Sequence, residues 1–179
     1  MGRGAGGSRG GGVAGKFSGF EPMLKGIPEE HYSNLKQIKE RPNRRGLSGE
    51  YNAATRTITM DSNYRKDHPG LYSRTLKHEV GHNVWDYHIS NEQRVRLLYA
   101  YERDIHRMET GLGMPYGSSP SQSSRGFWGI SNYVSSYGAT NVEEAFSEAY
   151  AYHFHGGRGS QQRVAKMDPE FGAVLREIS

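Results

Sequence analysis

The sequence predicts a single α+β domain that is mostly helical, with a small β-sheet or hairpin edging a cleft. Apolar residues recur at helical spacing in several segments, and the segment 50–60 has the pattern of a hairpin. The 179 residues are enough for one domain with a buried core plus a tail. A hydrophobic fraction of 34% and a mean hydropathy of -0.82, with no apolar run of about 18 residues, argue against a membrane span.

Residues 1–19 are rich in glycine and are expected to form a disordered tail or linker, which leaves residues 20–179 as the domain. This segment lacks the apolar core of a signal peptide, so the compartment stays open; secretion, or delivery as part of a larger protein, is compatible with it. Residues 1–50 hold nine Lys and Arg against five Asp and Glu, which accounts for the net charge of +4. Arg3 and Arg9 are a weak electrostatic footprint, so nucleic-acid binding is not favoured.

The first predicted elements are a helix over 28–40 and a hairpin over 50–60. Pro28 suits the first turn of this helix, and its apolar stripe would consist of Tyr32, Leu35 and Ile38. The hairpin would turn at 52–55, and its β-branched strand, 57–60, would edge the cleft.

Two longer helices are expected next. The first runs from about Tyr72 to Tyr87, and its apolar stripe is formed by Leu76, Val80 and Val84. Ser90 and Gln93 have the spacing of a capping box at the start of the second, which ends at Gly111. The residues of its predicted buried face are Leu98, Tyr101, Ile105 and Met108.

The composition of residues 111–126 predicts a long loop, either a lid over an active site or a surface insertion. A helix is predicted over 141–154, with Thr140 and Glu143 as its capping box. Asp168 and Pro169 begin a last helix, whose predicted core face is formed by Phe171, Val174, Leu175 and Ile178.

The motif that carries chemistry is His78-Glu79-Val80-Gly81-His82. The two histidines lie one helical turn apart and point to the same side, so both ring nitrogens can reach one Zn²⁺. Because the chain has no cysteine, a metal must be held by His and carboxylate ligands. Glu79, about 100° around the helix, can take a proton from a metal-activated water as general base.

A catalytic zinc needs a third protein ligand. His88 has the spacing of the metzincin pattern, but Trp85 stands where that pattern requires a turn glycine. The other candidates, Glu144 and Glu148, lie one turn apart on the predicted helix 141–154, so one can bind metal while the other supports a ligand histidine.

Residues 135–149, together with the His-Glu-x-x-His helix, resemble the zinc metallopeptidase family of anthrax lethal factor and the Pro-Pro endopeptidases. In that family a Tyr follows the motif, a Glu lies seven residues later and an acidic residue four further on, as Tyr137, Glu144 and Glu148 do here. The resemblance covers roughly residues 45–178, with the middle poorly matched. The sequence departs from the family in the gap of 62 residues from His82 to Glu144, which contains the Ser- and Gly-rich loop. It implies that His78, His82 and Glu144 bind zinc.

The resemblance also implies two supporting roles. Tyr137 would stabilise the oxyanion or protonate the leaving amine. Glu148 would not bind the metal itself but would hold a residue that does. The expectation is a zincin-like zinc metalloendopeptidase that acts on a peptide or protein substrate. Two alternatives are a toxin or phage-associated effector module of the same fold, and a catalytically inactive zinc-binding interaction domain.

Overall fold

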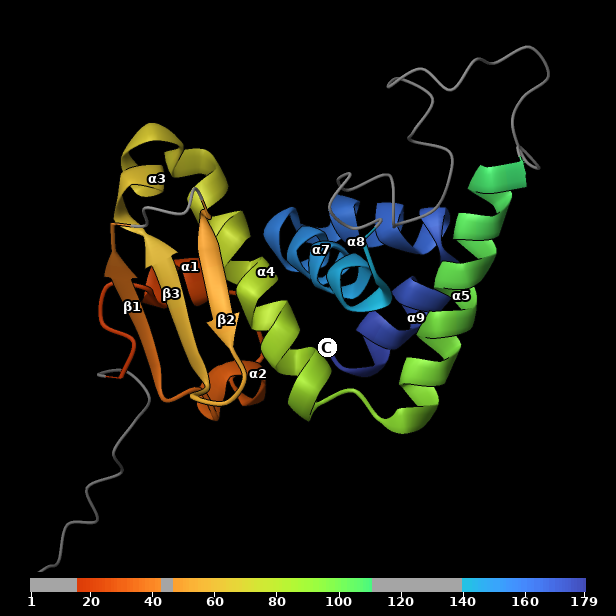
Figure 1. The fold of residues 1–179 in the computed structure, drawn as a ribbon, viewed down its shortest axis with the longest axis horizontal. Helices are drawn as coiled ribbons and strands as arrows, with labels where there is room; N and C mark the ends of the chain where they lie inside the picture. The colour runs from red at the N-terminus through yellow and green to blue at the C-terminus, as the bar shows by residue number, and fades with distance from the viewer. Residues whose placement is uncertain (1–15, 43–46, 111–139) are drawn as a thin grey trace, which may run out of the picture.

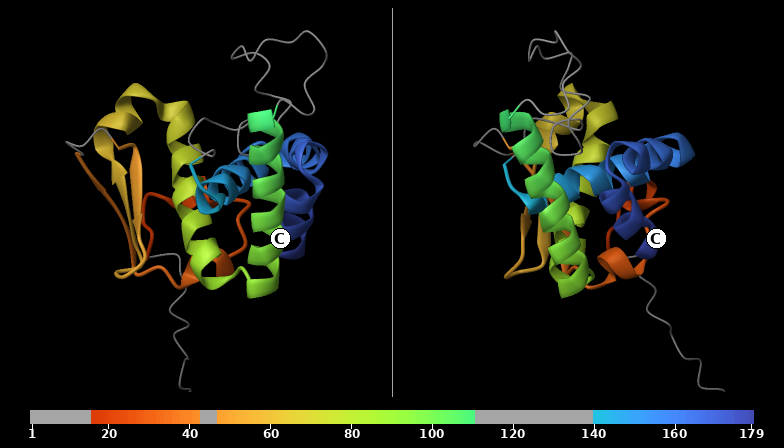
Figure 2. Two further views of the ribbon diagram at one scale, coloured as in Figure 1. Left: turned by 45° about the vertical axis from the view of Figure 1, so that its right-hand side comes forward. Right: turned by 90° about the vertical axis from the view of Figure 1, so that its right-hand side faces the viewer.

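The computed structural model describes residues 16–42, 47–110 and 140–179, with side chains placed up to 106 in the second range. A small sheet lies on one side of a long central helix, α4 (Pro69–Tyr87), and the helices that follow lie on its other side (Figure 1). The turned views in Figure 2 show the same order of sheet, central helix and C-terminal helices. The predicted α+β class, mostly helical with a small β-sheet, is therefore confirmed.

The sheet has three strands in the order β1-β3-β2. β1 (Gln37–Arg41) pairs in parallel with β3 (Thr57–Asp61), and β2 (Gly49–Asn52) pairs with β3 in antiparallel register, Tyr51 opposite Ile58. The predicted hairpin is thus confirmed, but its strand 57–60 is central and buried. β2 is the strand at the edge of the cleft.

The predicted helix over 28–40 is wrong. The chain forms a single turn, α2 (Glu30–Ser33), and then enters β1. Leu35 and Ile38 are buried as their pattern requires, but Ile38 lies in a strand that pairs with β3, whose partner residues come twenty positions later in the chain. A pairing this distant overrides a short helical periodicity.

The other described helices surround α4 or extend the C-terminal layer. Their bounds are α1 (Glu21–Leu24), α3 (Ser62–Asp67), α5 (Asn91–Thr110), α7 (Val142–His155), α8 (Gly157–Met167) and α9 (Pro169–Glu177). The sequence patterns predicted α4, α5, α7 and α9, but they did not predict α1, α3 and α8. None of the helices in the described ranges is long and apolar enough to cross a membrane.

The caps explain where several helices begin. Ser90 and Gln93 exchange hydrogen bonds between side chain and backbone, so the predicted capping box before α5 is confirmed. Asp168 accepts hydrogen bonds from the backbone N–H groups of Glu170 and Phe171, as expected for the start of α9. α7, however, is capped by Asn141, whose side chain accepts from the backbone N–H of residue 144, so the predicted capping box from Thr140 is wrong.

The buried face of α5 differs from prediction by one position. Leu97 and Ala100 are buried, whereas Leu98 is 42% exposed. Arg96, beside Leu97, forms salt bridges with Glu170 and Glu177 of α9. The predicted burial of Met108 is not tested, because this residue lies outside the described side chains.

The core extends into the segment predicted as tail. Phe17 is buried, packs edge-on against Tyr32 and belongs to the same cluster as the residues of α4. The packed region therefore includes residues before the predicted boundary at 20; residues 1–15 lie outside the described residues.

Candidate metal centre

The central helix α4 separates the core from the candidate site. Leu76, Val80 and Val84 are fully buried, which confirms the predicted stripe. His78 and His82 project from the opposite side, one turn apart, and line a cleft together with Glu79. The period of 3.6 residues per turn produces this division between an apolar face and a face with metal-binding chemistry.

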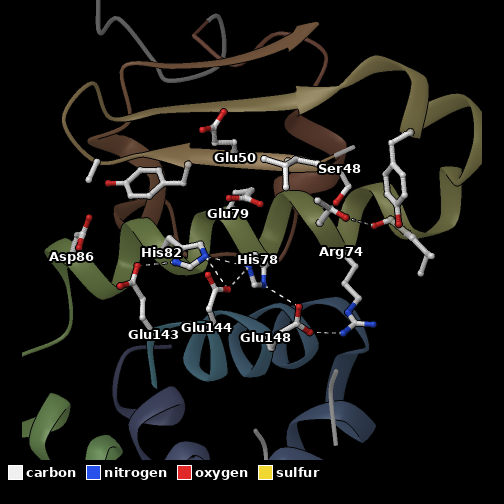
Figure 3. Close-up of a pocket in the computed structure, with 17 residues that line it drawn as sticks. Ser48, Glu50, Arg74, His78, Glu79, His82, Asp86, Glu143, Glu144 and Glu148 are labelled. Atoms are coloured by element: carbon white, nitrogen blue, oxygen red, sulfur yellow. Dashed lines mark hydrogen bonds and ion pairs between the residues drawn. The ribbon is translucent and has the colours of Figure 1, made fainter. Parts of the chain in front are cut away.

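The third member of the site comes from α7. Because Asn141 caps this helix, the first turn of α7 holds its carboxylates close to α4 (Figure 3). Glu144 Oε2 lies 3.2 Å from His78 Nε2 and 3.4 Å from His82 Nε2, and the two Nε2 atoms are 3.1 Å apart. His78, His82 and Glu144 are thus a group that could hold a metal ion.

These separations match the edges of a small tetrahedral site. Ligand atoms at about 2.0–2.1 Å from a tetrahedral Zn²⁺ lie about 3.3 Å from one another. The three measured edges, 3.1, 3.2 and 3.4 Å, bracket that value. Two imidazoles and one carboxylate are also a donor set that catalytic zinc uses, with the fourth position left open.

The outer nitrogen of each histidine faces a second carboxylate. His78 Nδ1 lies 3.1 Å from Glu148 Oε1, and Glu148 is itself held by Arg74 at 2.6 Å. His82 Nδ1 lies 2.8 Å from Glu143 Oε1. A partner on Nδ1 fixes the tautomer and leaves Nε2 to bind a metal, so both rings are oriented for the same point.

The carboxylates make the site strongly negative. Burial opposes the charged form of both imidazoles, but hydrogen bonds donated to Glu144 and Glu148 raise the pKa of His78 to about 9. Hydrogen bonds donated to Glu143 and Glu144 raise the pKa of His82 to about 10. Burial alone would raise the pKa of Glu144, yet the two histidines lower it to about 2.

Glu79 lies between α4 and the edge strand β2. It is 6% exposed, and burial raises its pKa, while a hydrogen bond from the Tyr51 backbone works in the other direction. A Cβ at Gly49 would come within 2.9 Å of Glu79 Oε1 and 3.0 Å of Thr75 Cγ2. Glycine at position 49 therefore allows β2 to approach Glu79 closely.

A second glycine sets the distance between the two helices. A Cβ at Gly81 would lie 2.8 Å from Ser147 Cα, in the backbone of α7. The absence of a side chain at Gly81 brings α4 and α7 close enough for Glu144 to meet the histidines. The glycine of the motif thus has a packing role here.

The site opens into a cleft of about 750 Å³. One wall is the face of α4 from Leu71 to Asp86, and the opposite wall is β2 with the preceding residues Leu47 and Ser48. These sixteen residues of helix span about 24 Å, which is the length of about seven residues of an extended peptide.

The structure brings together His78, Glu79, His82, Glu144 and Glu148 from the sequence prediction. His88, the alternative ligand, lies outside this group; its ring packs 5.4 Å from that of His31. Tyr137 and the possible lid 111–126 lie outside the described residues.

Sequence reasoning missed two residues of the site. Glu143 was assigned to capping, although Asn141 is the stronger capping residue type and leaves this carboxylate available. Arg74 precedes His78 by four positions on the same face of α4, and this spacing could have identified it as the partner of Glu148.

Comparisons of the chain with protein-family models, with curated proteins and with solved structures give no match. The case for a function therefore rests on the geometry and chemistry of this site.

Proposed function

We propose that this protein is a zincin-like zinc metallopeptidase in which His78, His82 and Glu144 bind Zn²⁺. The convergence of their three donor atoms at 3.1 to 3.4 Å carries the proposal. A bound zinc would polarise both the substrate carbonyl and an attacking water. Each imidazole has a carboxylate on its Nδ1 side, which leaves the two Nε2 atoms facing Glu144 Oε2.

Glu79 is the proposed general base. It shares the face of α4 with the ligand histidines, lies beside them in the cleft and is not part of the metal-binding group. Its burial favours the uptake of a proton from water, and the same carboxyl can then pass this proton to the leaving amine. A base beside the donor set favours hydrolysis over the oxygen chemistry of iron sites with two histidines and one carboxylate.

The substrate class is inferred from the cleft wall. β2 pairs with β3 on one side, and no other strand of the described residues pairs with its second edge. The backbone carbonyl of Ser48 accepts a hydrogen bond from the Asp61 N–H, so alternation turns the backbone groups of Gly49 and Tyr51 outward, where the Tyr51 N–H donates to Glu79. An extended peptide that used the remaining backbone groups of this edge, as in β-augmentation, would lie in the cleft that the metal-binding group also lines.

The resemblance to the lethal factor and Pro-Pro endopeptidase family supports the same assignment through its motif spacings. Under this proposal Tyr137 stabilises the oxyanion. Delivery as a toxin-like or phage-associated effector module is compatible with the same chemistry. Tightly bound zinc with no cleavage of any peptide would instead support the alternative of a zinc-binding interaction domain.

The test is metal analysis joined to cleavage of a peptide library. Wild type is expected to bind one zinc and to cleave peptides. Glu79→Gln should keep the zinc and lose at least about a hundredfold in hydrolysis, because the base is removed and the ligands are not. His78→Ala and Glu144→Ala should lose the zinc, whereas His88→Ala should retain it. Full metal-dependent hydrolysis by Glu79→Gln, or zinc loss in His88→Ala with retention in Glu144→Ala, would contradict the proposal.

A further inference from the structure

Glu143 is a carboxylate of the cleft that neither binds at the centre of the site nor caps its helix. It lies in the first turn of α7, and Asn141 already caps that turn. Its Oε1 atom is 2.8 Å from His82 Nδ1. Since the two nitrogens of an imidazole point away from each other, a carboxylate on Nδ1 stands on the far side of the ring from a metal on Nε2.

We infer that Glu143 is a positioning residue for the metal ligand His82. It accepts the Nδ1 proton, which holds the ring in the tautomer with Nε2 free, and fixes the rotation of the ring toward His78 and Glu144. This inference rests on the proposed zinc site and extends it to a residue outside the ligand set. The partner of a ligand histidine commonly contributes 10- to 100-fold to metal affinity.

Of the two glutamates that contact the Nδ1 atoms of the histidines, Glu143 can be replaced with less disturbance than Glu148. Glu148 supports His78 in the same way, but its side chain is 12% exposed and is bound to Arg74. The side chain of Glu143 is 42% exposed, and His82 keeps Glu144 as a carboxylate neighbour when Glu143 is replaced. Replacing it therefore changes the support of His82 with little effect on the packing of α7.

The remaining restraint on the His82 ring comes from the other wall of the cleft. Tyr51 of β2 stacks parallel to it, with ring centroids 6.4 Å apart, and donates its hydroxyl to Asn83. Stacking restrains the ring plane but does not select a tautomer. The tautomer is selected by the hydrogen bond that His82 Nδ1 donates to Glu143.

The experiment compares zinc affinity of the full chain, measured by chelator competition, with thermal unfolding of the zinc-free protein. Glu143→Ala is expected to weaken zinc binding 10- to 100-fold and to leave zinc-free unfolding near that of wild type. Glu143→Gln should recover part of the loss, because the amide oxygen can still accept the Nδ1 proton. Glu50→Ala is the matched control, an exposed glutamate that lines the same cleft from β2.

Three results would overturn the inference. The zinc affinity of Glu143→Ala could lie within twofold of wild type, or its loss of zinc affinity could be no larger than that of Glu50→Ala. The zinc-free Glu143→Ala protein could also lose thermal stability to a matching extent, which would mark a structural role. Failure of the wild type itself to bind zinc would overturn the proposed function, and is distinguished from these results because it appears before any substitution. Visible absorption of the Co²⁺-loaded protein gives an independent readout. Its ligand-field bands should shift in Glu143→Ala and remain in Glu50→Ala.

Discussion

His78 and His82 in the cleft and His31 and His153 in the core are all largely buried, yet their surroundings give them opposite properties. The cleft pair is hydrogen-bonded to carboxylates, and its pKa values are raised. Burial lowers the pKa of both His31 and His153 to about 4. Burial alone therefore does not distinguish a metal-binding histidine from a core histidine. The two kinds of histidine are distinguished by the carboxylates of α7, which contact only the cleft pair.

The core group is organised by aromatic and backbone contacts. His31 Nδ1 is 2.9 Å from the Tyr150 hydroxyl, and the ring also bonds to the backbone of Ile178. His88 and Phe154 pack against the same ring at 5.4 and 6.0 Å between centroids. Burial and the charge of His88 lower the pKa of His31, against the hydrogen bond to the Ile178 backbone, which raises it. His88, the alternative ligand suggested by sequence spacing, thus packs against a core histidine and not in the cleft.

The largest expected effect follows from separating α4 from α7. In Gly81→Ala the new methyl group would meet the backbone of Ser147, which cannot move aside as a side chain can. The helices must shift, so we expect zinc affinity to fall about 100-fold and the free energy of unfolding to fall by about 1–3 kcal/mol. Chelator competition and urea unfolding measure the two effects.

Gly70→Ala provides the control on the same helix. A Cβ at Gly70 meets nothing within 4 Å, so alanine there should bind zinc as wild type does and be neutral or slightly stabilising. Equal zinc affinity in the two alanine variants would show that close approach of α4 and α7 is not what assembles the site.

The second effect is a dependence of stability on pH that belongs to the core group. The unfolded chain binds a proton on each histidine near pH 6.5, whereas the folded chain does so on His31 and His153 only near pH 4. Between these values the unfolded state binds more protons. The stabilisation is therefore complete above pH 6.5 and is lost as the pH falls through 4, by about 1–2 kcal/mol per histidine after allowance for partial solvent screening.

His153→Met isolates this contribution. His153 faces Ser179, Arg176 and Phe154, and Arg176 adds to the lowering of its pKa. Urea unfolding of the zinc-free proteins at pH 7 and 4.5 should show a smaller loss in the variant than in wild type. Taking the difference between the two proteins cancels the contribution of His78 and His82, which they share. An unchanged loss would mean that His153 is not held neutral by its surroundings.

The same contrast shows what the sequence could reveal. The helix α4 was predictable because Leu76, Val80 and Val84 and the two histidines of the motif share a helical spacing of four residues. The start of α9 was predictable because its cap, Asp168, is adjacent to the first helical residues. Local signals of this kind need no knowledge of the rest of the chain. Glu144 and Glu148 could be proposed because their spacing places them on one face of α7.

What the sequence could not reveal depends on contacts between distant segments. β1 exists because Ile38 pairs with Ile58, and the helical pattern around it gave no sign of that partner. Glu143 and Glu144 are adjacent and chemically alike, so only the placement of α7 against α4 decides which of them meets Nδ1 and which meets Nε2. α8 has Val164 as its one buried residue, too little for a periodic signal.

The smallest expected effect concerns Tyr150, which lies on α7 two residues beyond Glu148 but faces the core. Tyr150→Phe removes the hydroxyl that bonds His31 Nδ1 and leaves a buried nitrogen without its partner. The free energy of unfolding should fall by about 1 kcal/mol, while zinc affinity stays within twofold of wild type. Tyr152→Phe, on the same helix with its hydroxyl toward exposed Arg163, should change stability by less than about half as much. A loss of zinc affinity in Tyr150→Phe would show that the two histidine groups are coupled through α7, and that the carboxylates alone do not set them apart.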